Sequence, residues 1–511
     1  MTTHDPINNA INDHINTLSQ CCFINGQWVS ATGDMLISNN PATGSVVWQG
    51  QCADEKSIDI AFHAAQAAFQ SWAQTPLDAR LALIHQYKTL LEDNKTLLAD
   101  DIMQETGKPQ WESLSEVNTM IAKIAVSINA YHERTGMMHN DQGQQQGQQQ
   151  TQLRHRPHGV CAVFGPYNFP GHLPNGHIIP ALIAGNTIVF KPSEQTPRVG
   201  ERLIRLMQAA GFPDGVINFV PGELQTAKAI TAHPLLRGFF FTGSSAVGIQ
   251  IHRQFAGQPD KIIALEMGGN NPLIITPNVD IEAAVYHTIQ SAFITAGQRC
   301  TCARRLIIVD SPKKQAFIDA LCNAAQQLHI DAPDATPQPF YSTLINQRAA
   351  DGLLAAEKRL TSLGGIPLLP MQSVIADKPY LSPGIIDMKA VDVALIPDEE
   401  YFGPLLKIHH ADNLTHAIEL ANATAYGLSA GIFTDCEDEW QQFYALSHAG
   451  IINRNKPLTG ASGAMPFGGT GLSGNHNPGA YYAADYCAYP VASMMANNLT
   501  LPDTLAPGWQ Q

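Results

Sequence analysis

The 511-residue sequence lacks the cysteine spacings that hold metals or redox centres. Its nine cysteines include no C-x-x-C pair, and no two of them have the spacing of a zinc knuckle. The histidines of "HLPNGH", at 172 and 177, do not match H-E-x-x-H, and no carboxylate lies between them. We therefore predict no metal site, and we expect most of the cysteines to be small buried apolar side chains.

The chain also has no excess of basic residues and no long apolar run. Lys and Arg number 30 against 44 Asp and Glu, a formal net charge of -14, which argues against nucleic acid and anionic membranes as partners. A small acidic substrate stays compatible, because local arginines can form a basic pocket. The longest apolar stretch, residues 177–190, is too short to span a bilayer. The first 18 residues lack a signal-peptide pattern, so we expect a cytoplasmic protein.

What the chain does have is a succession of patterns that predicts an α/β protein of two or three domains. Residues 23–50 indicate a short antiparallel β entry, and residues 57–136 carry helical periodicity. From residue 159 short apolar strands alternate with helices, and a second alternating region begins near residue 271. Such alternation predicts parallel sheets covered on both faces, with ligands beyond the carboxyl ends of the strands.

One segment is of low complexity, the glutamine-rich stretch at residues 141–152. It lies between two short segments that are able to pair as a β-hairpin. We interpret it as an exposed loop at the tip of that hairpin. Nothing in the sequence explains why glutamine was chosen there.

The stretch "TAGQRCTCARR", residues 295–305, raises the main chemical question. Cys300 and Cys302 are open to four interpretations: half of a metal site, a redox pair, two packed core thiols, or one nucleophile with an inert neighbour. The helical pattern from residue 281 to 296 ends at Gly297, and a strand begins at Arg304. The pair therefore lies in a helix-to-strand turn, which disfavours two packed thiols. Residues two apart there point to different sides.

Two glycine-rich stretches are candidates for binding phosphate. The G-x-G-x-x-G at residues 469–474 neither follows a clear strand nor opens a helix, so we reject it as a dinucleotide fingerprint. The stretch "FFFTGSSAVG", residues 239–248, predicts a strand ending at Gly243 and a helix starting at Ser244 or Ser245. The free N–H groups of such a helix start favour a pyrophosphate, although an ordinary serine cap has the same pattern.

Seven segments resemble the aldehyde dehydrogenase family and follow one another in the family's order. They are "GPYNFP" (165–170), "KPSE" (191–194), "FTGSSAVG" (241–248), "LEMGGN" (265–270), "GQRC" (297–300), "EEYFGP" (399–404) and "PFGGTGLSG" (466–474). Any one of them alone is modest support. Seven in order, at the family's separations, make a strong case.

The resemblance implies a Rossmann-type cofactor domain, an α/β catalytic domain and a small β arm used for oligomerisation. We assign residues 1–138 and 159–268 to the NAD-binding domain, and residues 269–465 to the catalytic domain. Residues 139–158 and about 480–500 are assigned to the oligomerisation arm. The resemblance also implies a homo-oligomer, either a dimer or a dimer of dimers.

Four longer segments are similar to a narrower group of the family, the N-succinylglutamate 5-semialdehyde dehydrogenases. These segments are residues 154–177, 265–275, 295–305 and 455–469. The implied reaction is NAD-dependent oxidation of that semialdehyde to N-succinylglutamate, in the succinyltransferase route of arginine catabolism. The alternatives are a dehydrogenase of another small acidic semialdehyde, a CoA-acylating enzyme, and a cofactor-binding protein without turnover.

The resemblance assigns catalytic roles to three residues. Cys300 matches the nucleophile, and a thiol with a pKa of about 8.5 needs help from its site, from Arg299 or from the nicotinamide cation. Asn168 matches the side-chain amide that stabilises the oxyanion with the Cys300 backbone N–H, although the residue alone also suits a turn before Phe-Pro. Glu266 matches the general base for thioester hydrolysis. A surface glutamate at a strand end is the alternative, but a carboxyl at the end of an apolar strand, next to "MGG", should have a raised pKa, and we prefer the base.

The resemblance also indicates NAD as the cofactor. Lys191 and Glu194 match positions that bond the adenosine ribose, and a carboxylate there would repel the 2′-phosphate of NADP. The remaining cofactor positions match the pyrophosphate loop, the nicotinamide-ribose site and the ring beside the nicotinamide; they are Gly243, Ser244, Gly248, Glu400 and Phe402.

An acidic substrate calls for cations near the active site, preferably arginine. Our candidates are Arg154, Arg156, Arg299, Arg454 and Lys456. Two residues depart from the family's pattern. Asn270 stands where the family often has Lys, and Arg454 stands where we expect an aromatic side chain.

Overall fold

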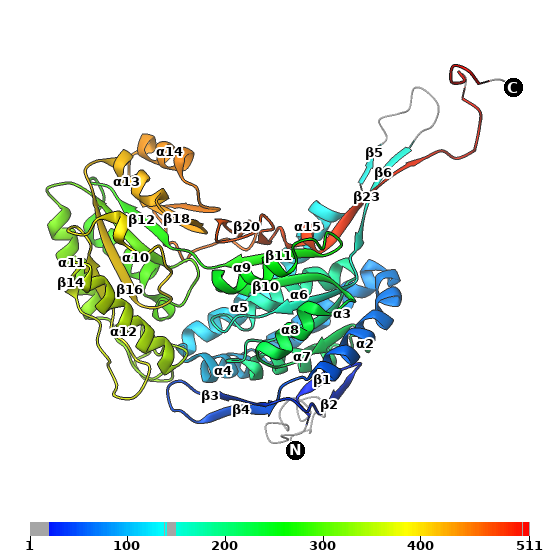
Figure 1. Cartoon of the computed structure of the whole chain (residues 1–511), viewed down its shortest axis with the longest axis horizontal. Helices are drawn as coiled ribbons and strands as arrows, with labels where there is room; N and C mark the ends of the chain where they lie inside the picture. Colours follow the sequence, from blue (N-terminus) through cyan, green and yellow to red (C-terminus); the bar gives the residue numbers. More distant parts are fainter. Residues whose placement is uncertain (1–19, 137, 141–149, 503, 510–511) are drawn as a thin grey trace.

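The computed structural model describes residues 20–136, 138–140, 150–502 and 504–509. Two seven-stranded sheets form the bulk of it, one from the N-terminal half of the chain and one from the C-terminal half. A three-stranded sheet projects from the side of the first of these (Figure 1). Parallel strands with helices on both faces confirm the predicted α/β class.

The first sheet has the strand order β11-β10-β7-β8-β9-β1-β2. Strands β11, β10, β7, β8 and β9 run parallel, whereas β1 and β2 form an antiparallel edge. Every residue of β7 and β8 is buried, which accounts for continuous apolar runs in place of alternation. The strands are β1 (Cys22–Ile24), β2 (Gln27–Val29), β7 (Val160–Phe164), β8 (Thr187–Lys191), β9 (Ile217–Phe219), β10 (Leu236–Gly243) and β11 (Ile262–Met267).

Helices cover both faces of this first sheet. One face packs against α3, α4, α5, α6 and α7, and the other against α2, α8 and α9. Gly107, with φ 72°, ends α4, and α5 begins after Pro109, as the "ETGKP" pattern predicts. The helices are α2 (Glu55–Gln74), α3 (Leu77–Asp93), α4 (Lys95–Thr106), α5 (Gln110–Ala130), α6 (His172–Ala184), α7 (Pro197–Ala209), α8 (Leu224–Ala232) and α9 (Ser245–Gln254).

The second sheet has the order β14-β15-β16-β13-β12-β18-β19, with only β14 antiparallel to its neighbour. Its two faces pack against α10, α11 and α12 on one side and α13 and α14 on the other. The strands are β12 (Asn271–Ile275), β13 (Ala303–Val309), β14 (Ile366–Leu369), β15 (Gly384–Asp387), β16 (Leu405–Ala411), β18 (Ser429–Phe433) and β19 (Ile451–Arg454). The helices are α10 (Ile281–Ala292), α11 (Lys314–Gln326), α12 (Gln347–Ser362), α13 (Leu414–Asn422) and α14 (Glu437–Leu446).

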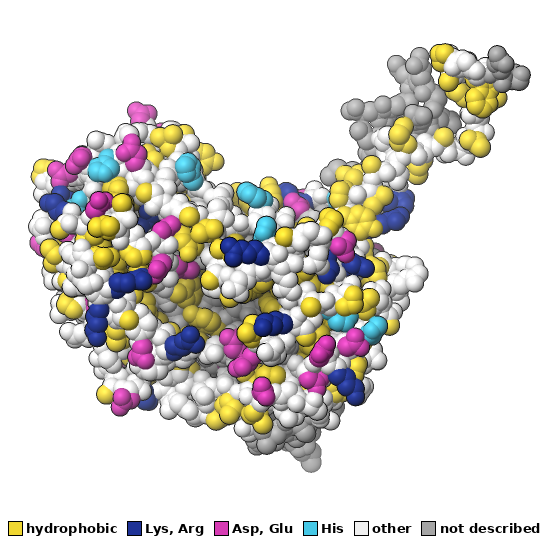
Figure 2. All heavy atoms as spheres, viewed as in Figure 1, with side chains coloured by type: hydrophobic (Ala, Val, Ile, Leu, Met, Phe, Trp, Pro, Cys, Tyr) yellow, Lys and Arg dark blue, Asp and Glu magenta, His cyan; other side chains and the backbone are white. Residues whose placement is uncertain are grey.

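The projecting sheet has the order β23-β6-β5 and is antiparallel throughout. Its strands are β5 (Met138–Asn140), β6 (Gln150–Pro157) and β23 (Ala488–Met495). Strands β5 and β6 form the predicted hairpin, while residues 141–149 of the glutamine-rich stretch lie outside the described residues. Hydrophobic side chains are exposed along this projection and beyond it (Figure 2); they include Tyr489, Met494, Leu499 and Leu501.

Short elements complete the described chain. They are β3 (Met35–Asn39) with β4 (Val46–Gln51), β17 (Tyr426–Gly427) with β21 (Thr470–Gly471), β20 (Pro466–Phe467) with β22 (Gly479–Ala480), α15 (Ala483–Tyr486), and the single turns η1 (Tyr131–Thr135), η2 (Ile294–Gly297) and η3 (Val393–Leu395). Within the described residues, no helix combines the length and the apolar character needed to cross a membrane.

Candidate active site

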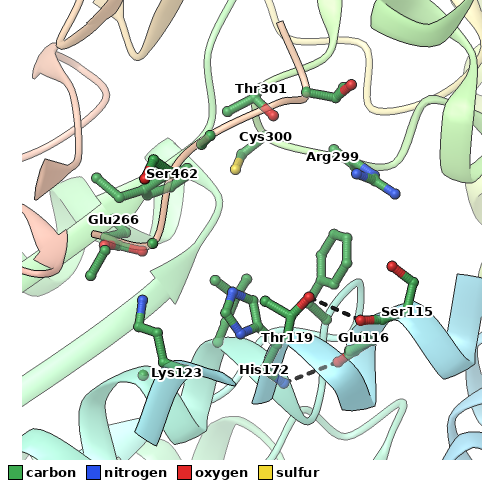
Figure 3. Close-up of a pocket in the computed structure, with 18 of the residues that line it drawn as sticks. Ser115, Glu116, Thr119, Lys123, His172, Glu266, Arg299, Cys300, Thr301 and Ser462 are labelled. Carbon is green, nitrogen blue, oxygen red and sulfur yellow. Dashed lines mark hydrogen bonds between the residues drawn. The ribbon is translucent and has the colours of Figure 1, made fainter. Parts of the chain in front are cut away.

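A cavity of about 220 Å³ lies where α5 and α6, the end of β11 and the turn before β13 meet (Figure 3). Cys300 lines it from the turn, and Glu266 lines it from the end of β11. The segment from residue 459 to 480 contributes a further wall. The two residues of greatest chemical interest, 34 positions apart in sequence, thus face one enclosed space.

The turn that carries Cys300 has an unusual backbone. Thr295 and Ala296 have positive φ values of 59° and 51°, so α10 ends at Ala292 and not at residue 296 as predicted. Gly297 follows with φ 70°, and a Cβ there would overlap the carbonyl of Gly403. Only glycine meets both conditions, which explains the glycine in "GQRC".

The two cysteines of this turn occupy different environments. The side chain of Cys302 is fully buried and does not line the cavity. The sulfur of Cys300 points into the cavity (Figure 3). This separation matches the expectation from their spacing, and it leaves one thiol of the pair accessible to a bound molecule.

The Cys300 thiol is protonated near neutral pH in this structure. Burial raises its pKa, with further increases from Glu400 and Glu266, and Arg304 opposes them. Arg299, the neighbour expected to help, is turned elsewhere: its guanidinium donates to Glu112 and to the Thr295 hydroxyl, at 2.7 Å in each case. An additional positive charge is therefore needed to form the thiolate.

Side-chain amides hold the backbone around Cys300. Asn168 is buried, and its Nδ2 donates to the Gln298 carbonyl at 3.0 Å. Asn271 was not predicted; its Nδ2 donates to the carbonyls of Cys300 (2.7 Å) and Cys302 (2.9 Å). Because these bonds fix the peptide planes of the turn, they also fix the direction of its N–H groups.

Glu266 lies at the end of β11 with 5% of its surface exposed. Burial raises its pKa to about 7, against Lys123, the Gly479 backbone N–H and the Thr242 hydroxyl, which lower it. A Cβ at position 479 would overlap the Glu266 carboxylate, so this glycine allows the close approach. A carboxyl group with a pKa near the working pH suits a general base.

The G-x-G-x-x-G at residues 469–474 covers the Glu266 strand end. It contains β21 and opens no helix, as predicted. Its Ser473 carbonyl accepts from the Met267 N–H at 3.1 Å, and Gly474 bridges to Glu266. The segment thus pairs with the end of β11 beside Glu266 without itself lining the cavity.

The predicted pyrophosphate loop has the expected strand-to-helix form. Strand β10 ends at Gly243, Ser244 caps α9, and the Ser244 hydroxyl accepts from the Val247 N–H at 3.4 Å. A Cβ at Gly248 would overlap Met267 of β11, so glycine permits close packing of α9 on the sheet. The first-turn N–H groups of α9 are therefore presented beyond the sheet's edge, where an anion can bind.

Lys191 is the last residue of β8, and Glu194 follows it in the loop before α7. Lys191 is buried, its Nζ donates to the Pro192 carbonyl at 2.7 Å, and it lies 3.8 Å from the Glu194 carboxylate. Glu194 has 46% of its side chain exposed. A ribose with free hydroxyls fits a carboxylate acceptor beside an ammonium donor.

Glu400 and Phe402 lie beside Arg304 on the far side of Cys300. Burial raises the pKa of Glu400 to about 7, although Arg304, 3.7 Å away, and a hydrogen bond from the Gly269 N–H lower it. Within the described residues, the buried Oε1 of Glu400 has no hydrogen-bond partner. An acceptor left open in this way fits a ligand hydroxyl, such as a ribose hydroxyl of a dinucleotide. The Phe402 ring contacts Tyr167 edge-on, with centroids 6.1 Å apart.

Of the five cations predicted for the substrate, Arg299 alone lines the cavity. Arg154 and Arg156 lie on β6, opposite β23 in the projecting sheet. The guanidinium of Arg454 is paired with Glu437 at the start of α14. Lys456 follows β19 and does not line the cavity either.

The charged face of α5 was not predicted from the sequence. Glu112, Glu116 and Lys123 are buried and line the cavity, on the same side of the helix as the core residues Met120 and Ile124. Their spacing of four and seven residues places them on one helical face. The sequence did contain a signal for these three residues, because charged side chains recur on the apolar face of this amphipathic helix.

The two histidines of "HLPNGH" have separate partners. His177 is hydrogen-bonded to the Tyr486 hydroxyl at 2.7 Å and to Thr242 at 3.2 Å. His172 lines the cavity, and its backbone N–H donates to Glu116. Across the described ranges, no three His, Cys, Asp or Glu side chains are grouped to hold a metal ion.

Comparison with known proteins gives one family. The aldehyde dehydrogenase family matches residues 28–490. Aldehyde dehydrogenase from Bacillus cereus, solved as an E194S mutant, is 28% identical, with a TM-score of 0.89 over 97% of this chain and 99% of that one. NADP-dependent glyceraldehyde-3-phosphate dehydrogenase from Bacillus halodurans C-125, solved with NADP, is 25% identical, with a TM-score of 0.86 over 94% and 100%. A protein from Sinorhizobium meliloti 1021 assigned as a methylmalonate-semialdehyde dehydrogenase, solved with NAD, shares the fold: 23% identity, TM-score 0.87, 94% and 99% covered.

Proposed function

The chain belongs to the aldehyde dehydrogenase family, and from this we propose that it oxidises N-succinylglutamate 5-semialdehyde to N-succinylglutamate with NAD. The observation that carries the proposal is one cavity lined by a thiol and a buried carboxylate, Cys300 and Glu266. Oxidation through a thioester needs these two groups in succession, first a nucleophile and then a base.

Cys300 acts first. Its thiolate adds to the aldehyde carbon, and the carbonyl oxygen becomes an oxyanion, for which the family resemblance assigns the Asn168 amide and the Cys300 backbone N–H as donors. Donors placed in advance in this way typically contribute a factor of about 10² to 10³ in rate. Bound NAD would supply the acceptor for the hydride of the tetrahedral carbon and a positive charge that favours the Cys300 thiolate over the protonated thiol.

Glu266 acts second. The thioester left on Cys300 is hydrolysed when the Glu266 carboxylate takes a proton from a water molecule that attacks the acyl carbon. The Thr242 hydroxyl and the Gly479 backbone N–H contact the Glu266 carboxylate and hold it within the same cavity. Because water accepts the acyl group from Cys300, the product is the free acid. Transfer of the acyl group to CoA, which gives a CoA thioester, is the alternative.

The residues that suit the cofactor come from three segments. Ser244 and the first turn of α9 suit the pyrophosphate, and Lys191 with Glu194 suits the adenosine ribose. Glu400 suits the nicotinamide ribose. The Glu194 carboxylate supports NAD over NADP, because a 2′-phosphate placed beside it would meet a negative charge. Both dinucleotides occur in similar structures.

The cavity contains two cations that suit a substrate carboxylate. Arg299 and Lys123 both line it, together with the carboxylates of Glu112, Glu116 and Glu266, and the hydroxyls of Ser115, Thr301 and Ser462 add donors. The similarity of residues 154–177, 265–275, 295–305 and 455–469 to the narrower group favours the succinylated semialdehyde. Another small acidic semialdehyde is the second candidate, which the same cavity would accept.

Turnover with a panel of aldehydes tests the substrate. NADH formation is measured at 340 nm for N-succinylglutamate semialdehyde, succinate semialdehyde, methylmalonate semialdehyde and a neutral aldehyde of similar length. We expect the highest kcat/KM for the succinylated substrate and loss of activity in Cys300→Ala. A much higher kcat/KM for another aldehyde would overturn the substrate while leaving the class. Product analysis with and without CoA separates hydrolysis from acyl transfer.

We also propose that the three-stranded projection joins copies of the chain into a dimer or a dimer of dimers. Its exposed Tyr489, Met494 and Met495 leave apolar surface on β23. Light scattering after size-exclusion chromatography measures the mass in solution. A monomer at micromolar concentration would contradict this assignment.

A further inference from the structure

The charged side chains that line the cavity form ion pairs, except Lys123 and Glu266. Lys108 contacts Glu116 at 2.7 Å, and Arg299 contacts Glu112 at 2.7 Å. Lys123 is 6% exposed and lines the same cavity. Among the residues that the structure describes, no carboxylate oxygen lies within 4 Å of its ammonium. Burying an ammonium without a close counter-ion costs free energy. This cost indicates a functional reason for a lysine at position 123.

The Lys123 side chain points from α5 toward Glu266 across the cavity (Figure 3). Its ammonium lies over Gly176 of α6, 3.9 Å from where a Cβ would stand, so α6 leaves room for it. Lys123 and Glu266 interact electrostatically in both directions, each stabilising the charged form of the other. Glu266 is therefore the carboxylate whose negative charge stabilises the Lys123 ammonium.

The other titratable groups described around Lys123 and Glu266 carry no unpaired positive charge. On α6, His172 and His177 are neutral, because burial, with a smaller contribution from Lys123, lowers the pKa of each to about 3. On α5 and the Cys300 turn, the charges of Glu116 and Arg299 are already paired. The remaining titratable neighbours are the Cys300 thiol and the Tyr486 hydroxyl of α15, and burial keeps both protonated.

We propose that Lys123 is a positioning residue: it supplies the positive charge opposite Glu266 that holds this carboxylate ready to accept a proton from the attacking water. The inference rests on the proposed function, since it concerns the hydrolysis step at the same site. Removal of the ammonium leaves Glu266 among apolar groups and two uncharged donors, where the protonated acid is favoured. The base then forms only at higher pH.

Burial lowers the pKa of Lys123 to about 8 and raises that of Glu266 to about 7, and each partner opposes the effect of burial on the other. Between these values both groups are charged. The pair therefore operates in the pH range in which a carboxylate base and a protonated lysine coexist.

Hydrolysis of p-nitrophenyl acetate by the full chain with saturating NAD tests the inference, because this ester acylates Cys300 without an aldehyde and NAD supplies the positive charge that the thiolate needs. Lys123→Met, Lys123→Gln and Lys123→Arg are compared with wild type from pH 5.5 to 9, with the acylation burst and the steady-state rate measured separately. Thr119→Val, one turn earlier on α5 at the same cavity, is the matched control.

We expect the steady-state rate of Lys123→Met and Lys123→Gln to rise at higher pH than in wild type, by about one pH unit, with about a tenfold loss at pH 6.5. The burst is kept, Lys123→Arg restores most of the profile, and Thr119→Val leaves the midpoint in place. An unchanged midpoint in two folded, burst-competent variants overturns the inference. So does an effect confined to KM for acidic aldehydes, which would make Lys123 a substrate contact. Absence of any burst in wild type, with no NADH from any aldehyde, would instead refute the proposed function.

Discussion

Glu266 predicts a specific pH dependence for the hydrolysis step. Its pKa of about 7 lies well above the usual carboxyl value, chiefly because the side chain is buried. A base must be ionised, so the active fraction rises with pH: about a tenth of the molecules at pH 6 and about nine-tenths at pH 8. Where hydrolysis limits turnover, kcat should therefore increase about tenfold over these two pH units.

Stopped-flow measurement of NADH resolves the step concerned. The first turnover, which forms NADH, does not need Glu266 as a base, whereas every later turnover waits for hydrolysis. At pH 6 we expect a burst of close to one NADH per active site followed by a slow phase. The slow phase should accelerate through pH 7, and the burst amplitude should persist.

Glu266→Gln is the control, because it keeps the shape of the side chain and removes the base. We expect a burst with almost no slow phase at any pH between 6 and 8. A steady-state rate in wild type that stays flat down to pH 5 would refute the reasoning, since a buried carboxyl cannot then be the group that titrates.

Three further predictions concern neighbouring parts of the site. Gly479→Ala places a methyl group where the Glu266 carboxylate now lies, so steady-state turnover should fall at least about tenfold with the NADH burst kept; equal rates in stopped flow would contradict the close approach. Glu194→Ser removes the exposed carboxylate beside Lys191 and should raise kcat/KM for NADP relative to NAD about tenfold; an unchanged ratio would show that the selectivity lies elsewhere. Cys302→Ala should keep most activity, since that side chain is packed and does not line the cavity, and a loss as deep as that of Cys300→Ala would make the two thiols a functional pair.

Much of the fold could be predicted because its patterns are local. Parallel strands buried on both sides appear as short apolar runs, and helix ends appear as Gly and Pro, as at Gly107 and Pro109. The end of α10 could not be predicted in this way. Thr295 and Ala296 adopt positive φ in a turn that packs against Gly403, and that contact joins distant parts of the chain.

The residues of the candidate site also differ in whether local patterns or long-range contacts decide their positions. The positions of Cys300 and Glu266 at a turn and a strand end follow from local patterns and from the family's motifs. The cations differ, because the partner of an arginine depends on which segments the fold brings together. Arg454 pairs with Glu437 and Arg299 with Glu112, whereas Lys123 faces the cavity. Tertiary contacts that no short motif records decide these outcomes.

The departure at Asn270 has a structural explanation. Its Nδ2 donates to Asp398 at 2.8 Å, and its Oδ1 accepts from Lys407 at 3.4 Å. Lys407, fully buried on β16, thus places an ammonium beside the residue where the family often has one. The ammonium comes from β16, two strands away from β12 in the second sheet, so an amide at position 270 links the loop before Glu400 to that sheet.

The central claim, a covalent acyl intermediate on Cys300 that Glu266 resolves with water, is tested most directly by mass spectrometry. The Glu266→Gln variant is mixed with N-succinylglutamate semialdehyde and NAD, quenched in acid and digested. We predict an N-succinylglutamyl adduct on the peptide that contains Cys300 and Cys302, located at Cys300 by fragmentation and equal in amount to the NADH burst. An adduct at Cys302, or an NADH burst without any adduct, would contradict it.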